Sequence, residues 1–318
     1  MRVLHIGKYF PPFAGGMETY LRDLMAAQAR QGIDPSALVH RSTLSLHSLE
    51  ESYQANEKEL PITRTGVWAR FLFTPISPAF PWQLHRLIRR QRPDILHIHM
   101  PNVSAFWALL SPRARSSPWV VHWHADVLAS SHPLGLRLFY LLYRPFERAL
   151  LRQSRAIIAT SPPYLASSKP LQQAGDKCHV VPLGLDPASL AGDDHPRAGR
   201  ATDAPLRVLA VGRLTYYKGL EYLIRAMALM EHGELHLVGS GDLEAKLHKL
   251  ARDLRLDQRV TFHGHLSDQQ LAAQLNACDC LCLPSIERTE AFGVVLLEAM
   301  SRAKATVISD VPGAGMGW

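Results

Sequence analysis

Short apolar runs alternate with amphipathic stretches along most of the chain, and this alternation predicts the secondary structure. Apolar runs indicate buried β-strands at residues 2–6, 95–99, 119–122, 156–161, 178–182, 206–212, 235–239, 260–264, 278–284 and 305–309. Helical spacing indicates helices at residues 17–31, 82–91, 134–153, from 220, at 271–276 and through 298–302. Because strands that alternate with helices pair in parallel, we expect a parallel sheet in each half of an α/β fold.

Residues 34–80 interrupt this pattern. Their apolar and aromatic side chains stand among basic ones and include Val67, Trp68, Phe71, Leu72 and Phe73. Such a stretch could lie on a membrane surface. Core packing joined by loops is the commoner use of these residue types and is the preferred interpretation.

The length of 318 residues fits two domains. A segment rich in Pro, Gly, Asp and Ala at residues 187–205 predicts a linker. We therefore expect an N-terminal domain at residues 1–186 and a C-terminal domain at residues 206–318.

Charge is divided unevenly between the halves. Residues 1–185 hold 21 Lys and Arg against 11 Asp and Glu, whereas residues 186–318 hold 14 against 17, within a total of +7. A basic half fits nucleic acid, anionic lipid or a charged acceptor, although such charge can also serve solubility alone. The sequence has neither a recognition-helix motif nor an aromatic RNA-binding signature, so nucleic acid is not an expected partner.

The cysteines and the N-terminus favour the cytosol. Cys278, Cys280 and Cys282 alternate along a predicted strand and would share one of its faces, while Cys178 stands alone. Buried reduced thiols explain this pattern better than a metal site. No stretch approaches 18 uninterrupted apolar residues, and the N-terminus lacks the apolar centre of a signal peptide.

The most informative chemistry lies between Glu290 and Glu298, two carboxylates with seven residues between them. Glu290 follows a polar, turn-like run, and Glu298 falls inside a predicted helix. The start of that helix would present backbone N–H groups to an anion, and it comprises Phe292, Gly293, Val294 and Val295. Amides for a diphosphate, flanked by carboxylates for hydroxyls, describe a nucleotide-sugar site. Two glutamates alone are more often solvated surface residues.

Glycine loops and cations follow several predicted strands. The residues concerned are Gly15 and Gly16 after the first strand, Arg213 and Lys218 after residues 206–212, Gly239 after the next strand, and Leu266 after the one that follows. The first loop is not the Gly-x-Gly-x-x-Gly fingerprint, which argues against a dinucleotide enzyme. Taken singly, such residues are more often turns and surface charges.

Histidines stand at the ends of two predicted strands. His97 and His99 share a face, but no carboxylate lies near them in the sequence, so structural or rim positions are preferred over metal ligation. His124 follows residues 119–122, at the edge where parallel sheets display functional residues. Its ring could donate to a hydroxyl or carry charge near neutral pH, and a ring bonded to backbone is an equal alternative.

These blocks, taken in order, resemble those of the family 4 retaining glycosyltransferases with the GT-B fold. The matching passages are His122-Trp-His124-Ala-Asp126, Pro182-x-Gly184-x-Asp186, Gly212-Arg213-Leu-x-x-x-Lys218-Gly219 and Glu290-x7-Glu298. The resemblance implies two facing Rossmann-like domains with a cleft between them.

The resemblance also implies a role for each candidate residue. Arg213, Lys218 and the amides of residues 292–295 would hold the leaving diphosphate, Glu298 the ribose, Glu290 the donor-sugar hydroxyls, His124 the region of the reacting carbon, Gly15 and Gly16 the donor phosphates, and Gly239 and Leu266 the nucleoside. Transfer in this family needs no metal, and no cofactor is expected. No side chain is an evident nucleophile, which fits the front-face mechanism proposed for the family.

The implied reaction is transfer of a hexosyl unit from a nucleoside-diphosphate sugar to a glycan or lipid-linked acceptor, in bacterial surface polysaccharide or lipopolysaccharide synthesis. A cytosolic enzyme that touches the anionic inner membrane face would suit such an acceptor. Two alternatives stay open: a catalytically incomplete protein that binds nucleotide sugar, and a sugar-nucleotide epimerase of the same fold. The family normally continues for several tens of residues past position 318, so we expect a truncated C-terminal domain.

Overall fold

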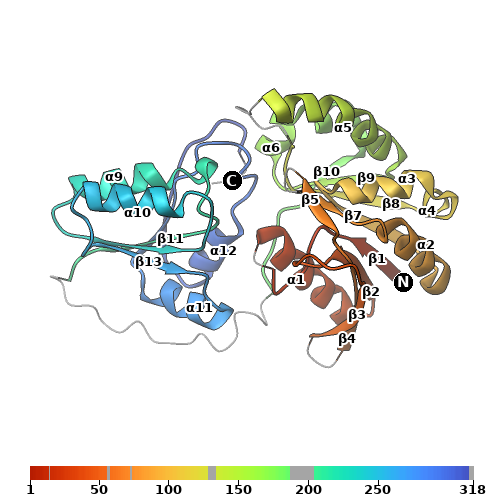
Figure 1. The fold of residues 1–318 in the computed structure, drawn as a ribbon, viewed down its shortest axis with the longest axis horizontal. Helices are drawn as coiled ribbons and strands as arrows, with labels where there is room; N and C mark the ends of the chain where they lie inside the picture. Colours follow the sequence, from red (N-terminus) through yellow and green to blue (C-terminus); the bar gives the residue numbers. More distant parts are fainter. Residues whose placement is uncertain (14, 56–57, 72–73, 128–133, 187–203, 315–318) are drawn as a thin grey trace. The chain divides into compact units, whose positions relative to one another are not determined.

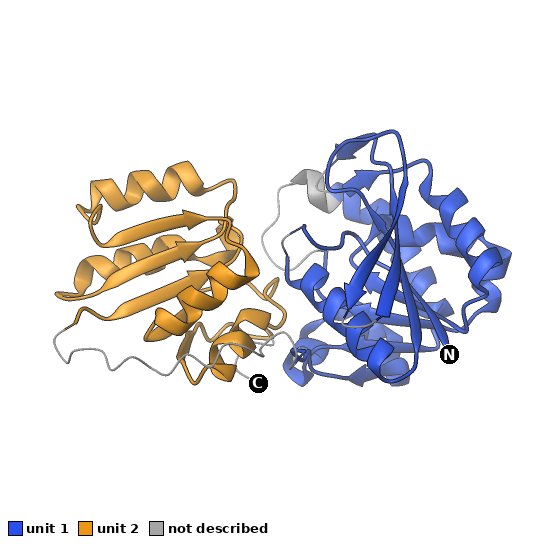
Figure 2. Cartoon of the chain, turned by 90° about the horizontal axis from the view of Figure 1, so that it is seen from below, with its two compact units in different colours: residues 1–186 blue, residues 187–318 orange. Residues whose placement is uncertain are grey.

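The computed structural model describes residues 1–13, 15–55, 58–71, 74–127, 134–186 and 204–314, with the backbone alone at 134–137. Two compact units divide the chain, Met1–Asp186 and Pro187–Trp318, coloured separately in Figure 2. Most of the predicted linker, residues 187–203, lies outside the described residues. Each unit is considered by itself.

Unit 1 is built on an eight-stranded sheet with the order β10-β9-β8-β7-β1-β2-β4-β3 (Figure 1). Its strands are β1 (Arg2–Ile6), β2 (Asp34–His40), β3 (Leu49–Ala55), β4 (Lys58–Thr65), β7 (Ile95–Met100), β8 (Trp119–Trp123), β9 (Ala156–Ala159) and β10 (Cys178–Val180). Neighbouring strands pair in parallel, as predicted, except at the edge, where β3 pairs with β4 antiparallel. The central strands are buried on both faces, which explains their continuous apolar runs.

The helices of unit 1 cover both faces of this sheet. They are α1 (Gly16–Arg30), α2 (Phe80–Gln91), η1 (Val103–Phe106), α3 (Trp107–Leu110), α4 (Pro112–Ser116), α5 (Leu134–Gln153), α6 (Pro162–Ser167), α7 (Lys169–Ala174) and η2 (Gly175–Lys177). From β1 the chain passes through α1 to β2, toward one edge of the sheet. From β7 it passes to β8 and then through α5 to β9, toward the other edge. Right-handed crossovers therefore put α1 on one face and α5 on the other (Figure 1).

Unit 2 has a five-stranded parallel sheet with the order β13-β12-β11-β14-β15. Its strands are β11 (Arg207–Val211), β12 (Glu234–Val238), β13 (Val260–Gly264), β14 (Cys280–Leu283) and β15 (Ala305–Ile308). Its helices are η3 (Tyr216–Lys218), α9 (Leu220–Leu229), α10 (Glu244–Asp253), α11 (Asp268–Ala277) and α12 (Val294–Ser301). Val208 joins the core beneath α9 and α10, and Leu209 joins the core beneath α11 and α12, as strand alternation requires.

Two sequence-based expectations fail in these units. Cys280 and Cys282 contact the same core, but Cys278 ends α11 and packs in the opposite core, so the three thiols do not share one face. The segment 34–80 is largely β-structure: besides β2, β3 and β4 it contains the hairpin of β5 (Ala69–Phe71) and β6 (Thr74–Ile76). Core packing is right for buried Val67 and wrong for Trp68 and Phe71, which are exposed, while residues 72–73 lie outside the described part.

The last residue of unit 1 is fixed to its first helix. Arg30, at the end of α1, donates from both terminal nitrogens to the two carboxylate oxygens of Asp186, each at 2.8 Å. Asp186 is buried, so this paired contact fastens the point where the unit ends. Among the described residues no helix combines the length and apolar content that spanning a bilayer requires.

Candidate functional site

Glycines close the turns at the carboxyl ends of three neighbouring strands in unit 2. Gly239, after β12, has φ +127°, and a Cβ there would lie 2.1 Å from the carbonyl oxygen of Gly212, after β11. Gly219 has φ +63°, and its Cβ would lie 2.1 Å from the carbonyl oxygen of Pro284, after β14. Only glycine fits such contacts. Main chain therefore packs against main chain at the edge where open α/β sheets bind ligands.

Helix α12 begins against the end of β14, close to the predicted position. Its N-cap is Gly293, with φ +81°, and a Cβ there would lie 2.7 Å from Cδ2 of Leu283. No side chain caps this start, and the first turn carries no acidic residue. The positive end of the helix dipole is therefore open to an anion, as the sequence predicts.

Lys218 and Glu290, predicted to bind different parts of a donor, are brought together. The Lys218 side chain lies over Gly212, and its Nζ donates to Oε2 of Glu290. The hydroxyl of Ser285 donates to the same oxygen at 3.3 Å. Burial alone would lower the pKa of Lys218, but the Glu290 carboxylate holds that pKa above its ordinary value. The lysine is therefore charged, and its side chain lies against the glycine turn that follows β11.

The other predicted residues of unit 2 differ in their exposure. Arg213 is exposed, and its charge lies near enough to Lys218 to oppose protonation there. Glu298 is half-buried in the second turn of α12. The side chains of Leu266 and Val295 are half-buried and pack against the core beneath α11 and α12. Phe292 is half-buried just before the helix.

Sequence reasoning missed Ser285 and Glu287. Glu287 is buried and accepts a hydrogen bond of 3.1 Å from the hydroxyl of Tyr216. Both belong to the polar run that follows β14, and its position at a strand's carboxyl end was the available signal.

Five histidines gather on one face of the unit 1 sheet. His5 pairs in register with His97 across β1 and β7, and His99 pairs with His122 across β7 and β8. His124 follows two residues later on the face of His122. All five are buried, with exposures of 0–6%. His5 and His122 were not predicted, because a single histidine in an apolar strand carries no signal until the register is known.

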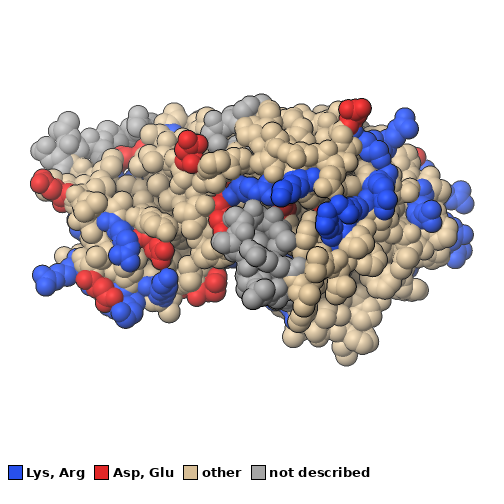
Figure 3. All heavy atoms as spheres, turned by 90° about the horizontal axis from the view of Figure 1, so that it is seen from above, with Lys and Arg blue, Asp and Glu red and all other residues tan. Residues whose placement is uncertain are grey.

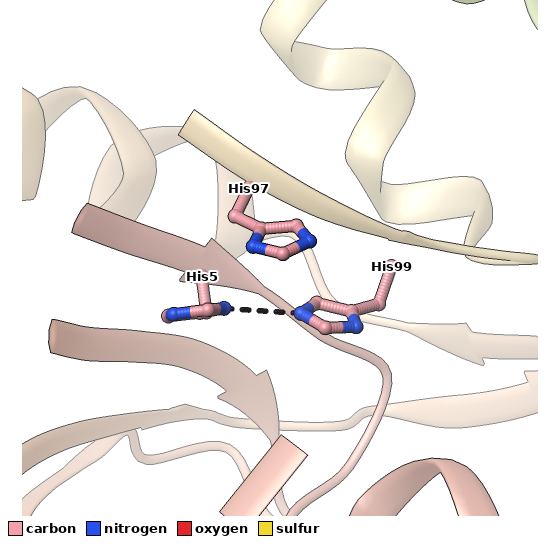
Figure 4. Close-up of side chains that lie close together, drawn as sticks. All are labelled: His5, His97 and His99. Atoms are coloured by element: carbon pink, nitrogen blue, oxygen red, sulfur yellow. Dashed lines mark hydrogen bonds between the residues drawn. The ribbon is translucent and has the colours of Figure 1, made fainter. Parts of the chain in front are cut away.

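Hydrogen bonds join three of these rings to helix α1. Nε2 of His5 lies 2.8 Å from Oε1 of Gln28. Nδ1 of His5 lies 3.0 Å from Nε2 of His99 (Figure 4), and Nδ1 of His99 lies 3.0 Å from Nε2 of His124. The rings of His99 and His124 are nearly parallel, at 17°.

Burial keeps these rings neutral. Desolvation lowers the pKa of His124 to about 3 and that of His5 to about 4, and it lowers the other three well below the ordinary value. This burial favours a neutral His124 over the charged ring that the sequence also allowed near neutral pH. Among the described residues, the hydrogen-bond partner of the His124 ring is a side chain, since Nε2 lies 3.0 Å from Nδ1 of His99.

The histidines include two triads whose nitrogens lie within 4.8 Å of one another, His5-His97-His99 and His99-His122-His124. One ion would need ring planes that converge on it at about 2.0–2.1 Å. His122 instead lies over His124 at 4.4 Å and 10°, and His97 lies over His99 at 4.7 Å and 15°. The closest nitrogens already share protons in the hydrogen bonds above, so this arrangement favours a hydrogen-bonded stack over a metal centre.

Gly15 and Gly16 lie at the start of α1, at the same edge of the sheet. Gly15 is the N-cap in an extended conformation, and no side chain caps the helix. A Cβ on Gly15 would lie 2.2 Å from Oε2 of Glu18, a buried carboxylate in the first turn that sequence reasoning missed. An acidic residue there already interacts favourably with the helix dipole, so this start is less open to phosphate than that of α12.

A hollow of about 320 Å³ in unit 1 lies elsewhere. Val3, Pro35 and Gln91 are among its lining residues, which belong to the amino ends of β1 and β2 and the end of α2. Ligands of open α/β sheets bind at the opposite, carboxyl edge. The histidines and the start of α1, rather than this hollow, define the candidate site of unit 1.

Comparison with known families assigns both units. Residues 15–184 match the glycosyl transferase 4-like domain, and residues 193–315 match glycosyl transferases group 1. The chain is 30% identical to O-antigen chain mannosyltransferase C of Escherichia coli over 98% of its own length and 80% of that protein. The chain belongs to this family of glycosyltransferases. The enzyme is also 28% identical to a D-rhamnosyltransferase of Pseudomonas aeruginosa, over 98% and 78% of the two chains.

Solved structures assign the fold of the glycosyltransferase. Sucrose-phosphate synthase from Thermosynechococcus elongatus matches with a TM-score of 0.72 and 23% identity, over 98% of this chain and 82% of that one. The lipopolysaccharide outer core galactosyltransferase WaaB matches with a TM-score of 0.60 and 19% identity, over 98% and 81%. The glycosyltransferase has the GT-B fold of two Rossmann-like domains, and the family and fold predicted from the sequence are confirmed.

Proposed function

We propose that the glycosyltransferase moves a hexosyl unit from a nucleoside-diphosphate sugar to a glycan or lipid-linked acceptor in bacterial surface polysaccharide or lipopolysaccharide synthesis, with retention of the anomeric configuration. The relatives named for O-antigen mannosyl transfer and D-rhamnosyl transfer support this substrate class. Structural neighbours are described in complex with UDP and with ADP, which supports a nucleotide donor.

The observation that carries the proposal is the start of α12, which no described side chain caps, in the same unit as the half-buried, charged Lys218. In this proposal the amides of residues 292–295 and Lys218, joined by Arg213, bind the diphosphate and stabilise the charge that develops as it leaves. Gly212 and Gly239 let the main chain approach the phosphates closely. Glu298 accepts from ribose hydroxyls and Glu290 from those of the sugar.

Lys218 can serve both partners. An ammonium has three donors, and only one is engaged by Glu290. Charge-assisted hydrogen bonds to phosphate are each worth about 1.5–3 kcal/mol. The pair therefore holds Lys218 in place while the remaining donors face the leaving group.

The pairing of Glu290 also bears on stereochemistry. A carboxylate that accepts from both Lys218 and Ser285 is a poor nucleophile, so a covalent sugar intermediate on Glu290 is disfavoured. Retention then follows from attack on the face that the diphosphate leaves. The C1–O bond to the phosphate breaks with its electron pair on the phosphate oxygen, the acceptor oxygen bonds to C1, and its proton passes to the departing phosphate. His124 takes part as a neutral hydrogen-bonding ring.

A donor screen followed by product analysis tests this function. Wild-type protein is first screened for a rise in melting temperature with UDP-, GDP- and ADP-sugars, and the best donor is then incubated with acceptor extracts. The proposal predicts release of nucleoside diphosphate that depends on acceptor, with a retained anomeric signal by proton NMR. Lys218→Gln should abolish release, whereas Lys246→Gln, an exposed lysine on α10, should not.

Three outcomes separate the alternatives. Donor binding without acceptor-dependent release would support a nucleotide-sugar-binding protein. An epimerised nucleotide sugar formed without acceptor would support an epimerase. Inverted product would contradict the front-face mechanism.

We also propose that the enzyme acts at the anionic inner face of the membrane through helix α5. Its outward side carries an apolar stripe at helical spacing, formed by Leu138, Leu141, Leu142 and Phe146, with exposures of 50–72%. Arg144, Arg148 and Arg152 are exposed on the same helix, and its Glu147 is buried. An apolar stripe flanked by arginines is the composition of helices that lie in a bilayer interface.

Neighbouring elements extend this surface. Phe146 packs on Phe106 of η1 with ring centroids 5.6 Å apart, and η1 leads directly into α3, where Trp107 and Leu110 are exposed. Figure 3, which views the molecule from the α5 side, shows Lys and Arg side chains gathered over unit 1. Anionic lipid would attract these side chains and favour membrane binding by about 1 kcal/mol for each basic residue at the surface.

Vesicle sedimentation tests this face. The double variant Leu141→Ser and Leu142→Ser should bind phosphatidylglycerol vesicles at least tenfold more weakly than wild type, since it removes two side chains from the apolar contact. Leu229→Ser is the matched control, because Leu229 is 88% exposed on α9 of the other unit. Equal binding by the double variant, or equal binding to neutral and anionic vesicles, would refute the proposal.

A further inference from the structure

Each hydrogen bond along the chain from Gln28 through His5 and His99 to His124 has a defined donor and acceptor. The oxygen of the Gln28 amide can only accept, so the N–H of His5 lies on Nε2. His5 is neutral, which leaves its Nδ1 as an acceptor and puts the N–H of His99 on Nε2. The same rule leaves Nδ1 of His99 as an acceptor and puts the N–H of His124 on Nε2.

The sheet fixes the spacing of this chain. His5 and His99 come from adjacent strands whose parallel register is set by backbone hydrogen bonds, and His124 follows β8, the next strand. Gln28 reaches the far end from α1, whose apolar side is packed in the core beneath it. Four residues separated by up to 119 positions therefore form one connected unit.

Packing around the chain leaves little freedom for ring rotation. His97 lies over His99, and His122 lies over His124. The ring of Tyr20, also from α1, meets His122 edge-on at 4.9 Å and His124 at 5.7 Å. Nε2 of His97 and both ring nitrogens of His122 have no hydrogen-bond partner among the described residues, so these two rings act by packing rather than by relaying protons.

We infer that Gln28, His5 and His99 are positioning residues that hold His124 in the Nε2–H tautomer and so present its Nδ1 as a hydrogen-bond acceptor to substrate. This inference rests on the proposed function for the role of His124 in transfer, but not for the tautomer itself. A hydroxyl of the substrate is the group that such an acceptor would bind.

The amide of Gln28 sets the direction of the whole chain, so a donor in its place should reverse it. Gln28 is half-buried, which leaves room for substitution at this position. In Gln28→Lys the ammonium can only donate to Nε2 of His5, which forces the N–H of each successive ring to Nδ1. In Gln28→Met the chain loses its anchor, and both tautomers of His124 become populated.

Imidazole nitrogen NMR on protein labelled at histidine reads these tautomers directly, with the signal of His124 assigned by its loss in His124→Asn. We expect His124 as Nε2–H in wild type and as Nδ1–H in Gln28→Lys. The matched control, His179→Gln, replaces an exposed histidine on β10 and should leave the His124 signal unchanged. An Nδ1–H tautomer in wild type, or an unchanged tautomer in Gln28→Lys and in Gln28→Met, would overturn the inference.

Kinetics separates this inference from the proposed function. Gln28→Met should lower kcat for sugar transfer about twofold to tenfold, the worth of one neutral hydrogen bond, with the KM of the donor little changed. Full activity of His124→Asn would contradict the role of His124 in transfer. The tautomer measurement would still test whether Gln28, His5 and His99 set the tautomer of His124. A tautomer shift in Gln28→Met with no loss of kcat would refute the positioning role.

Discussion

Removing either partner of the Lys218–Glu290 pair should destabilise unit 2 strongly, and removing both should not. Each side chain is 12% exposed, so Lys218→Met leaves a carboxylate almost out of water, with the Ser285 hydroxyl at 3.3 Å as its remaining side-chain partner among the described residues. Breaking a buried ion pair costs about 3–5 kcal/mol. Because the Ser285 hydroxyl still donates to the carboxylate, we expect Lys218→Met to cost about 3 kcal/mol, near the lower end of this range. Glu290→Gln should cost less, because Gln keeps an acceptor for Lys218.

The double variant Lys218→Met with Glu290→Gln removes both charges. Its free energy of unfolding should lie within about 1 kcal/mol of wild type, because no unpaired buried charge remains. The coupling energy from the four proteins should then reach about 2 kcal/mol or more, as expected for residues in direct contact.

The assay must report on unit 2. Five of the six tryptophans, at positions 68, 82, 107, 119 and 123, lie in unit 1, so tryptophan emission follows the wrong unit. Hydrogen exchange of peptides from α9 and α12, measured across a urea series, follows the right one. Strictly additive losses, with a coupling below about 0.5 kcal/mol, would refute the reasoning that the two charges depend on each other. Both single variants and the double variant should lose sugar transfer. Stability requires only that no buried charge is left unpaired, whereas transfer requires the side chains of Lys218 and Glu290 themselves.

Other predictions concern pH and glycine. Burial raises the pKa of Glu147 from 4.5 to about 7, so the folded state holds this proton more tightly than the unfolded state does. The free energy of unfolding should therefore fall as pH rises from about 4.5 to 7, by at most about 3 kcal/mol. Glu147→Gln should remove most of this pH dependence and should raise the melting temperature at pH 8 but not at pH 4. Because burial lowers the pKa of His124 to about 3, kcat/KM should show no histidine limb between about pH 5.5 and 8, and a limb that disappears in His124→Asn would contradict a neutral ring. Gly239→Ala should destabilise unit 2 by more than about 3 kcal/mol, because its Cβ would meet a carbonyl oxygen. Gly264→Ala should cost only about 1–2 kcal/mol, because Gly264 has a positive φ but open space around the added Cβ. Equal losses in the two variants would show that the main chains do not pack as described.

Much of the architecture can be read from the sequence, because buried parallel strands are continuous apolar runs between amphipathic helices. Helix α5 has the predicted bounds, and strand β13 lies within the predicted strand and loop at residues 260–266. The hairpin of β3 and β4 was missed, since β3 is an exposed edge strand without apolar alternation. Strands of this kind owe their existence to pairing with a neighbour, which local patterns do not record.

The candidate site divides in the same way. The start of α12 was predictable, because Gly293 precedes an apolar run. The pairing of Lys218 with Glu290 was not, since 72 positions separate them and only the adjacency of β11 and β14 brings them together. The histidine chain likewise depends on the register of three strands, so His5 and His122 carried no signal in the sequence alone.

The central claim is that unit 2 binds the diphosphate of a nucleotide sugar at the start of α12 with Lys218. Calorimetric titration of UDP, GDP and ADP into wild type, Lys218→Gln and Lys246→Gln tests it most directly. At least one nucleoside diphosphate should bind wild type and Lys246→Gln alike, and should bind Lys218→Gln about tenfold or more weakly, because that variant loses one charge-assisted hydrogen bond. Binding of none of the three to wild type, or equal binding to Lys218→Gln, would contradict it.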